Sequence, residues 1–386
     1  MRIHPDRLGF TLLLGALAGL PALSVDMGLP GLPQVQTEFS VAPGTVALTL
    51  SGFMIGFGLA QLLIGPLSDR IGRRPVLLVA LALYAFGGLV SWLAPTISML
   101  VLARVIQGMG AAGGPVLAFA IVRDLAEGEA ARARLSTISL VFSLAPVIGP
   151  TIGGGILELA GWRAIFAVQA ATGLALLATV MLGLGETRRP CEPKPVGSIL
   201  AERRTLAFGV VGALNLANVF CFVSGAPLLL LGTLQLSTMQ FGWAFALITS
   251  GVIAGAGINR FVSRQGWTAR LPLGLGLVSA TLAALAGTLL AGHVTLALLL
   301  PVFLLTTLSR GLVSPNVTHA ALENIPHMAG AGSALIGSMQ MLTGALAGFI
   351  VGLMFDQYGP LGVMITMTGF AVPAVLAWIY VERTYR

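Results

Sequence analysis

Charged side chains are scarce in this sequence. Only 9% of its 386 residues are Asp, Glu, Lys or Arg, whereas 56% are hydrophobic, and the mean hydropathy is +0.94. Ordinary soluble domains carry about 25% charged residues. This shortage excludes a water-soluble fold and indicates a chain that buries most of its length in lipid.

Residues that support other functions are also few. The two cysteines, Cys191 and Cys221, form no disulfide framework or metal-ligand spacing. The single lysine, Lys194, precedes Pro195, so the chain has no Walker A motif and no means of using ATP directly. The four histidines are scattered and no H-E-x-x-H or G-x-S-x-G run occurs, so we expect no cofactor, no metal and no enzyme activity.

The apolar stretches are about twenty residues long, the length that a helix needs to cross about 30 Å of hydrocarbon. The sequence therefore predicts an all-α integral membrane protein of about twelve transmembrane helices. Punctuation by charge, Gly and Pro places the predicted spans at 8–34, 45–66, 75–94, 98–121, 134–157, 162–184, 206–232, 240–261, 270–291, 294–316, 329–354 and 358–380.

Basic residues lie almost entirely on one side of the predicted membrane. Alternate loops, counted from the N-terminus, hold eighteen Lys and Arg residues on one side and only Arg163 on the other. By the positive-inside rule, both termini are predicted to be cytoplasmic, in a bacterial inner membrane. The same scatter, without aromatic interleaving, argues against a nucleic-acid partner despite the net charge of +7.

The longest polar segment, 186–205, is predicted to be a cytoplasmic linker. It separates an N-terminal half, 1–185, from a C-terminal half, 206–386, each with six spans. A weak internal echo supports duplication, because Pro115 and Pro315 lie 200 residues apart at equivalent places in spans 4 and 10.

Ionisable residues inside spans are costly, by about 2.5–3.5 kcal/mol each, and so mark functional sites. Asp26 is the only acid well inside a predicted span, and Arg104 and Arg310 are the only bases. Because burial disfavours the charged form of a carboxylate, Asp26 can take up and release a proton. The alternative is a structural ion pair between Asp26 and Arg104. Arg310 has either a structural role or a contact with a cavity.

The junction between spans 2 and 3 reads G-P-L-S-D-R-I-G-R-R-P over residues 65–75. It resembles the G-x-L-x-D-R-x-G-R-[KR] signature of the major facilitator superfamily, at the place where that family carries it. The resemblance implies two six-helix halves, a central cavity, and a loop that controls conformational change through Gly65, Asp69, Arg70, Gly72, Arg73 and Arg74.

Two further segments are similar to motifs of the same superfamily. Residues 104–112, R-V-I-Q-G-M-G-A-A, resemble a motif associated there with proton coupling, which implies such a role for Arg104 in addition to that of the buried acid Asp26. The run A-P-V-I-G-P-T-I-G-G over 145–154 resembles a motif that exporters carry and importers generally lack. The structural interpretation of that run is a Pro/Gly kink with close helix packing, and we expect this kink to be part of the mechanism. Its key residues are Pro146, Gly149, Pro150, Gly153 and Gly154.

Residues 26–33, D-M-G-L-P-G-L-P, are similar to the end of span 1 in the Bcr/CflA drug-resistance branch. Gly28 stands where that branch usually has Tyr, so a contact expected from the ring is missing. Small residues at a spacing of four, Gly52, Gly56 and Ala60 in span 2 and Gly344, Gly348 and Gly352 in span 11, let helices approach and slide. In the superfamily that the sequence resembles, these two spans meet between the halves, which implies rocking between inward-open and outward-open states. Static packing is the alternative.

These observations predict a proton-coupled secondary transporter that exports small drugs or antibiotics. The proton gradient is its energy source, the lipid bilayer its surroundings, and we expect it to be a monomer. Export of a small metabolite, or its import together with a proton, is the nearest alternative, and a membrane enzyme is a distant one. The candidate substrate contacts are Asp26, Asn215, Asn218, Phe220, Asn316 and Gln340.

Overall fold

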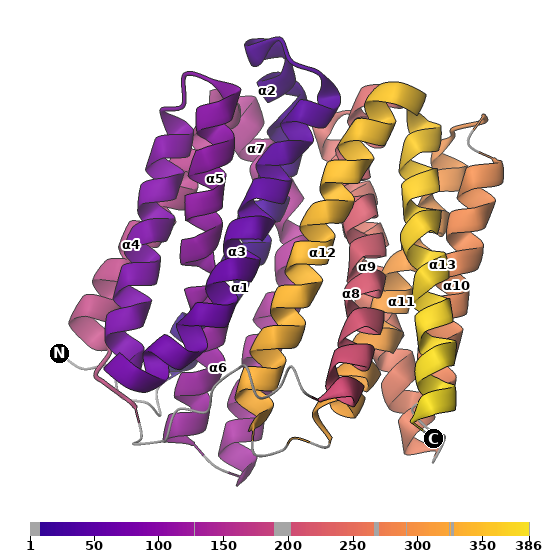
Figure 1. The fold of residues 1–386 in the computed structure, drawn as a ribbon. Coiled ribbons are helices and arrows are strands. Elements are labelled where there is room, and N and C mark those ends of the chain that lie inside the picture. The colour runs from indigo at the N-terminus through magenta and orange to yellow at the C-terminus, as the bar shows by residue number, and fades with distance from the viewer. Residues whose placement is uncertain are drawn as a thin grey trace. The chain divides into compact units, whose positions relative to one another are not determined.

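The structure is a computed structural model that describes residues 8–126, 128–188, 202–265, 270–290, 292–323, 325 and 328–385. Most of the predicted linker, residues 189–201 with Lys194 and Cys191, lies outside the described residues. The described chain is helical (Figure 1). Its elements are α1 (Leu8–Asp26), η1 (Leu29–Gly31), α2 (Leu32–Phe39), α3 (Pro43–Ile71), α4 (Arg73–Trp92), α5 (Ile97–Ala111), α6 (Gly113–Leu125), α7 (Gly128–Gly183), α8 (Arg203–Ala226), η3 (Pro227–Thr233), α9 (Thr238–Arg264), α10 (Arg270–Leu289), α11 (Leu296–Leu322), α12 (Ala329–Tyr358) and α13 (Pro360–Thr384).

Within the described residues, eleven helical stretches are long and apolar enough to cross a membrane. One of them, inside α7, is 51 residues long, which is more than twice the roughly 20 residues of a single crossing. Gly161 interrupts α7 with a φ of 78°, between the two spans that the sequence predicts there. The all-α membrane fold of about twelve crossings is therefore confirmed.

The chain forms two compact units. The first contains Met1–Gly31 and Gly52–Pro195, and the second contains Leu32–Ser51 and Val196–Arg386. These units differ from the predicted halves chiefly in the segment Leu32–Ser51, which joins the second unit. This segment includes α2 and the first residues of α3.

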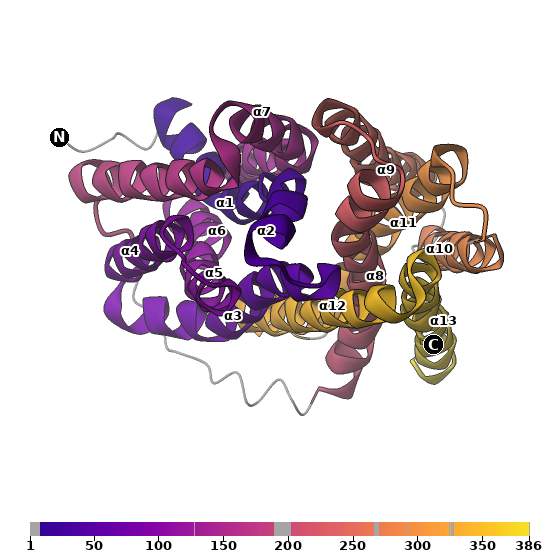
Figure 2. The same ribbon diagram turned by 90° about the horizontal axis from the view of Figure 1, so that it is seen from above.

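In the first unit, α1 packs against α6 and α7, and α4 packs against α5 and α7. In the second unit, α8 contacts α11, α12 and α13, and in the view from above it lies between α12 and α11 (Figure 2). Large apolar side chains are turned outward, for example Leu63, Leu102, Trp243 and Leu289. Outward-facing apolar residues are what a lipid-facing surface requires, because hydrocarbon is as apolar as a leucine side chain.

The predicted contact between spans 2 and 11 forms at the start of span 2. A Cβ on Gly52 or Gly56 would lie against Val101 or Val105 of α5, so these two glycines allow close packing within the first unit. Gly44, at the start of α3, lies against Gly352 of α12. Periodicity identified a small-residue face on span 2 but not which neighbouring helix covers it.

Candidate functional site

The first span is interrupted directly after Asp26, where α1 ends and the tighter turn η1 begins. The N–H of Gly28 donates to the carbonyl of Val25 at 3.1 Å rather than to that of Ser24. The carbonyl of Ser24 is therefore free to accept hydrogen bonds from other helices, as carbonyl groups at helix ends commonly are. Pro30 and Pro33 follow within the next turns and disfavour a regular continuation.

Two side chains donate hydrogen bonds to this free carbonyl group. Arg104 Nη2 and Gln169 Nε2 each donate to the carbonyl of Ser24 at 3.2 Å. Arg104 Nη1 also donates to Gln107 Oε1 at 2.7 Å, and Gln107 Nε2 donates to Gln169 Oε1 at 2.9 Å. The result is a closed, buried ring of polar contacts around the end of α1.

The hydroxyl of Tyr84 extends this network, because it lies 2.6 Å from the hydroxyl of Ser24. Ser24 in turn donates to the carbonyl of Leu20. We call the five residues Ser24, Tyr84, Arg104, Gln107 and Gln169 the Arg104 network. All five are at most 3% exposed, and α1, α4, α5 and α7 contribute to it.

The guanidinium of Arg104 is also flanked by aromatic rings. Its Cζ lies 4.4 Å from the ring centroid of Phe53 and 5.5 Å from that of Phe166. Such cation–π contacts stabilise a desolvated cation by about 2 kcal/mol. Arg104 also places positive charge at the C-terminal end of α1, which carries the negative pole of the helix dipole.

Asp26 lies beside this network, not in it. Among the described residues its carboxylate makes no side-chain hydrogen bond and no ion pair, with Arg104 or any other residue. Its side chain is 5% exposed. The structural ion pair that the sequence left open as an alternative is therefore absent from the described part of the chain.

Asp26 packs instead against the exporter-like motif of α7. A Cβ on Gly149 would lie 2.8 Å from Cβ of Asp26, and one on Gly153 would lie 2.1 Å from the carbonyl oxygen of Met27. Only glycine permits this approach of α1 to α7. Gly154 is buried on the same segment, and Pro146 and Pro150 lie within α7.

The predicted loop at 65–75 is shorter than expected. Residues 65–71 belong to α3 and residues 73–75 to α4, so Gly72 alone joins the two helices, with a φ of 107°. Arg73 binds the carboxylates of Asp69 and Asp124 and donates to Ser68 Oγ. This ion cluster ties the junction to α6, because Asp124 lies in its last turn.

The carboxylate of Glu186 caps the start of α4. It accepts the backbone N–H groups of Arg73 at 2.9 Å and Arg74 at 3.2 Å, and it occupies the space where a Cβ of Gly72 would stand. Burial acts to raise the pKa of Glu186, but the bonds from Arg188, Arg73, Arg74 and Thr187 outweigh it and hold that pKa below its ordinary value.

The remaining predicted residues of this junction differ in their contacts. Arg74 Nη2 donates to the carbonyl of Met181 at 2.8 Å, which fastens α4 to the end of α7. Arg70 is exposed and its side chain has no partner among the described residues. A Cβ on Gly65 would meet no atom within 4 Å, so packing does not require glycine there.

In the second unit, the structure brings together Asn215 and Gln340 and adds two neighbours on α11. Asn215 Nδ2 donates to Ser309 Oγ at 2.8 Å, and Arg310 Nη2 donates to Gln340 Oε1 at 3.0 Å. Gln340 Nε2 lies over Gly212, one helical turn from Asn215 on α8. We call Asn215, Ser309, Arg310 and Gln340, together with Asn218 one turn further along α8, the Arg310 cluster.

Asn316 and Phe220 lie outside the Arg310 cluster. Asn316 Nδ2 donates to Asn259 Oδ1 at 2.8 Å and so bridges α11 to α9. Phe220 is half-buried and makes no ring contact among the described residues. The aromatic packing at this level comes from Phe222, whose ring stacks on Phe245 at a centroid distance of 5.1 Å and tilts against Phe303 at 4.9 Å.

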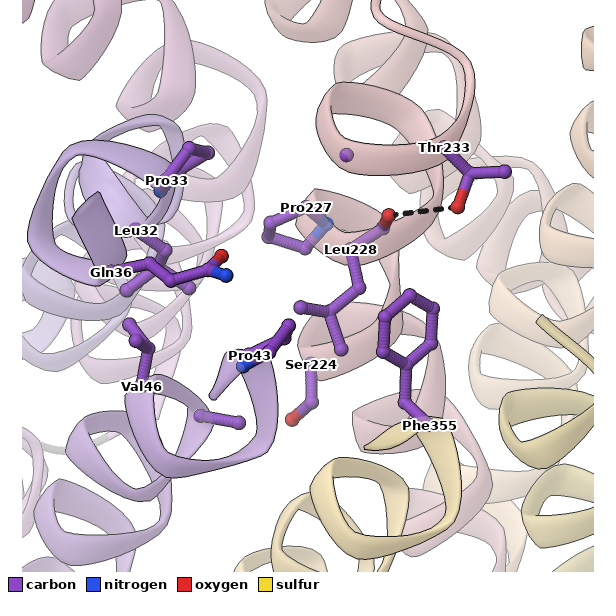
Figure 3. Close-up of a pocket in the computed structure, with 12 residues that line it drawn as sticks. Leu32, Pro33, Gln36, Pro43, Val46, Ser224, Pro227, Leu228, Thr233 and Phe355 are labelled. Atoms are coloured by element: carbon purple, nitrogen blue, oxygen red, sulfur yellow. Dashed lines mark hydrogen bonds between the residues drawn. The ribbon is translucent and has the colours of Figure 1, made fainter. Parts of the chain in front are cut away.

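The second unit also holds a cavity of about 300 Å³ (Figure 3). It lies where α2 and the start of α3 face the end of α8, and Gln36 points into it from α2. Its walls are mostly apolar. The hydroxyl of Ser224 on this wall is buried without a hydrogen-bond partner among the described residues.

The sequence analysis left several of these residues out of the candidate sites. Gln107 was inside a quoted motif but received no role. Tyr84 and Gln169 are polar groups in the middle of apolar spans, a signal that could have been used. Asp124 and Glu186 lie at span ends, where an acid is unremarkable, and only the fold shows that both act on Arg73.

Comparisons with known proteins agree with this architecture. The sequence profile of the Major Facilitator Superfamily matches residues 14–348. The chain belongs to this superfamily. It is therefore a multi-pass membrane transporter of small molecules, and the resemblance found in the sequence is confirmed.

Members of the superfamily similar to this chain include named resistance proteins. A bicyclomycin resistance protein homolog of Haemophilus influenzae is 31% identical over 96% of this chain and 95% of its own length. Multidrug resistance protein D of Escherichia coli is 27% identical over 95% and 94%. A bacterial homolog of the human lysosomal transporter Spinster superposes with a TM-score of 0.79 at 17% identity, covering 99% and 98% of the two chains, which supports the fold.

Proposed function

We propose that this transporter exports small drugs or antibiotics across a bacterial inner membrane in exchange for protons. The observation that carries the proposal is the position of Asp26, an acid without a hydrogen-bonding or ionic partner in the described structure, packed on Gly149 and beside the Arg104 network. The names of the similar resistance proteins support drugs as the substrate class.

Proton binding at Asp26 changes the charge next to the break in the first span. A neutral Asp26 packs against α7 without a desolvation penalty, whereas the charged form needs water, a cationic substrate or a rearrangement. Substrate and proton therefore compete for the charged form of Asp26. Arg104 binds the adjoining end of α1 through the carbonyl of Ser24. A movement of this end therefore changes the hydrogen bonds of the Arg104 network.

If Asp26 is the sole coupling acid, one proton enters for each substrate that leaves. Export of a neutral drug then moves one charge, and 100 mV supplies about 2.3 kcal/mol. This corresponds to a concentration ratio of roughly fifty, at 1.36 kcal/mol for each factor of ten. Export of a monovalent cation is electroneutral in this scheme and responds only to the pH difference.

Further assignments belong to the same proposal. The proton gradient is the only energy source, no cofactor takes part, and the transporter works as a monomer. Both termini lie in the cytoplasm, because eighteen basic residues fall on their side of the predicted membrane and one on the other. Asn215, Asn218 and Gln340 contact the substrate, and the junction at Gly72 controls the conformational change.

Proton release from detergent-purified protein tests the proposal. Addition of chloramphenicol or bicyclomycin to the wild type in weakly buffered solution is expected to release protons, and Asp26→Asn is expected to abolish the release. Glu158→Gln, which removes an exposed acid at the end of the same unit's fifth span, serves as the control and should release protons as the wild type does.

Equal release from wild type and Asp26→Asn would contradict the assignment of Asp26. Transport assays in inverted membrane vesicles test the direction of substrate movement, because the cytoplasmic face of the membrane points outward in these vesicles. Uptake into such vesicles on acidification of the lumen supports export. Substrate movement in the same direction as the protons would establish the importer instead.

A further inference from the structure

Arg310 on α11 is a cation with one of its two terminal nitrogens unpaired among the described residues. Nη2 donates to Gln340 Oε1 at 3.0 Å. Nη1 is buried and has no hydrogen-bond partner among the described residues. Because a guanidinium stays charged in proteins, Arg310 cannot relieve this situation by losing its proton. A charged group within a span needs compensation from a partner, water or a ligand.

No acid forms an ion pair with Arg310 among the described residues. The sequence has no Asp or Glu between Glu202 and Glu323, which covers all of α8, α9, α10 and α11. The acids at the ends of spans are already engaged: Glu323 pairs with Arg204, Glu382 with Arg270, and Asp356 accepts the N–H of Gly44. Arg310 is therefore a fixed positive charge without a counter-ion among the described residues.

The neighbouring asparagines also have unused hydrogen-bonding capacity. Asn215 Oδ1 is buried without a partner, although its Nδ2 bonds to Ser309. The amide of Asn218, one turn further along α8 and 1% exposed, makes no side-chain hydrogen bond to the described residues. Buried polar groups are nearly always paired, so several unpaired groups in one cluster indicate a ligand that pairs them.

A purely structural role explains the observed bond but not the charge. A link from α11 to Gln340 uses one N–H, and a neutral side chain could supply it at a lower desolvation cost. The free groups are instead complementary to an oxyanion, because an N–H of Nη1 can donate to a carboxylate oxygen in a charge-assisted contact. The free amide oxygen of Asn215 suits a hydroxyl or N–H on the same molecule.

We propose that the Arg310 cluster is a subsite for the oxyanion group of the exported substrate, so that the transporter favours small organic anions over cations. Arg310 binds the carboxylate or an equivalent delocalised oxyanion, and Asn215 and Asn218 bind a neighbouring polar group. This inference rests on the proposed export function and names its substrate class.

Binding of three fluorescent probes of equal size to the detergent-purified full-length protein tests the proposal. They are 2-naphthoate, 2-naphthamide and 2-naphthylmethylamine, which are anionic, neutral and cationic at pH 7.5. The wild type is expected to bind the naphthoate at least tenfold more tightly than the amine. Arg310→Gln should weaken naphthoate binding tenfold or more and naphthamide binding less than threefold.

Three controls separate binding from folding. Arg310→Lys keeps the charge and should retain part of the preference for the anion. Asn218→Ala should weaken naphthoate and naphthamide equally, because it removes a neutral contact. Arg264→Gln removes an exposed positive charge at the end of α9 and should change nothing. If Arg310→Gln fails to fold, the wild-type preference and Arg310→Lys decide the question.

The proposal is overturned if the wild type binds the amine as tightly as the naphthoate, if it binds no naphthoate, or if a folded Arg310→Gln keeps the anion preference. Proton release on addition of chloramphenicol to the same preparation distinguishes failure of the anion subsite from failure of the proton exchange. Release that depends on Asp26 without anion preference refutes only the subsite. Anion preference without such release refutes the proton exchange and leaves the subsite standing.

Discussion

Arg104 and Arg310 are both arginines inside the membrane-spanning part of the chain, yet their surroundings differ. Arg104 donates to two acceptors, the carbonyl of Ser24 and Gln107 Oε1, and lies between two aromatic rings. Arg310 has one acceptor, and its Nη1 is buried without a partner in the described structure. The first guanidinium is satisfied by the protein itself, and the second is not.

This difference shows that a buried arginine in a span does not always indicate the same role. Neither residue pairs with an acid in the described structure, so charge alone does not separate them. Their hydrogen bonds separate them. The bonds of Arg104 complete the end of a helix, whereas Nη1 of Arg310 stays unpaired in the described structure. Repetition of the two halves does not explain Arg310 either, because the 200-residue offset aligns it with Gly110.

The sharpest test of the comparison is removal of each charge in turn. Arg104→Gln leaves the carbonyl of Ser24 and Gln107 Oε1 without their donor, at a cost of about 1–3 kcal/mol for each buried group. Arg310→Gln removes an unpaired charge and should change the free energy of unfolding by less than about 1 kcal/mol. Thermal unfolding in detergent measures both, and equal losses would contradict the distinction.

The close contact of α1 and α7 should be the next most sensitive feature. Gly153→Ala places a methyl group 2.1 Å from the carbonyl of Met27, so we expect a loss of about 1–3 kcal/mol and of drug export. Gly155→Ala on the same helix meets no atom within 4 Å and is the matched control. Resistance assays and thermal unfolding should both separate the two variants, and identical behaviour would show that α1 and α7 do not need this contact.

A smaller effect is expected from the periphery of the Arg104 network. Tyr84→Phe removes the hydroxyl 2.6 Å from Ser24 Oγ, and one buried hydrogen bond contributes about 0.5–1.5 kcal/mol. Tyr358→Phe, at a tyrosine that is 55% exposed, should have no measurable effect. The difference in unfolding midpoint between these variants is the readout, and a null result for Tyr84→Phe would place its hydroxyl outside the network.

The smallest effect should come from the cap on α4. Because contacts in the folded state lower the pKa of Glu186, its stabilising effect is present above the ordinary value near 4.5 and is lost as the pH falls through the lowered pKa. A carboxylate at an exposed helix N-terminus contributes about 0.3–1 kcal/mol. Glu186→Gln should therefore lower the unfolding midpoint at pH 7 but not at a pH below the lowered pKa of Glu186.

The control for that prediction is Glu129→Gln, which removes an exposed acid from the first turn of α7. It tests whether any acid near a helix start has the same effect. A pH dependence of Glu186→Gln that matches the wild type throughout would contradict the capping role.

Much of the fold could be predicted from the sequence because the bilayer imposes a simple length rule. The predicted span 358–380 corresponds to α13, Pro360–Thr384, and the predicted break before 162 corresponds to Gly161. Asp26 could be singled out for a similar reason, since an acid in the middle of an apolar run is visible in one dimension. Its isolation from Arg104 could not be seen there.

The contacts that define the site join residues far apart in the chain, and composition holds no record of them. Gln169 reaches Ser24 across 145 residues, and Glu186 reaches the N–H of Arg73 across 113. Spacing within a helix shows which residues share a face, but the partner of that face depends on how the helices pack. Gly56 shows the same limit, because only the fold shows that its neighbour is α5.

The segment Leu32–Ser51 makes the chain cross between its two units three times, at Gly31–Leu32, Ser51–Gly52 and Pro195–Val196. Among the described residues, the crossing at Ser51–Gly52 lies inside a continuous helix, α3. A helix resists bending through its ladder of backbone hydrogen bonds, and a Gly/Ser pair is a common place for that ladder to yield. At this dipeptide a single helix passes from the packing of the second unit to that of the first.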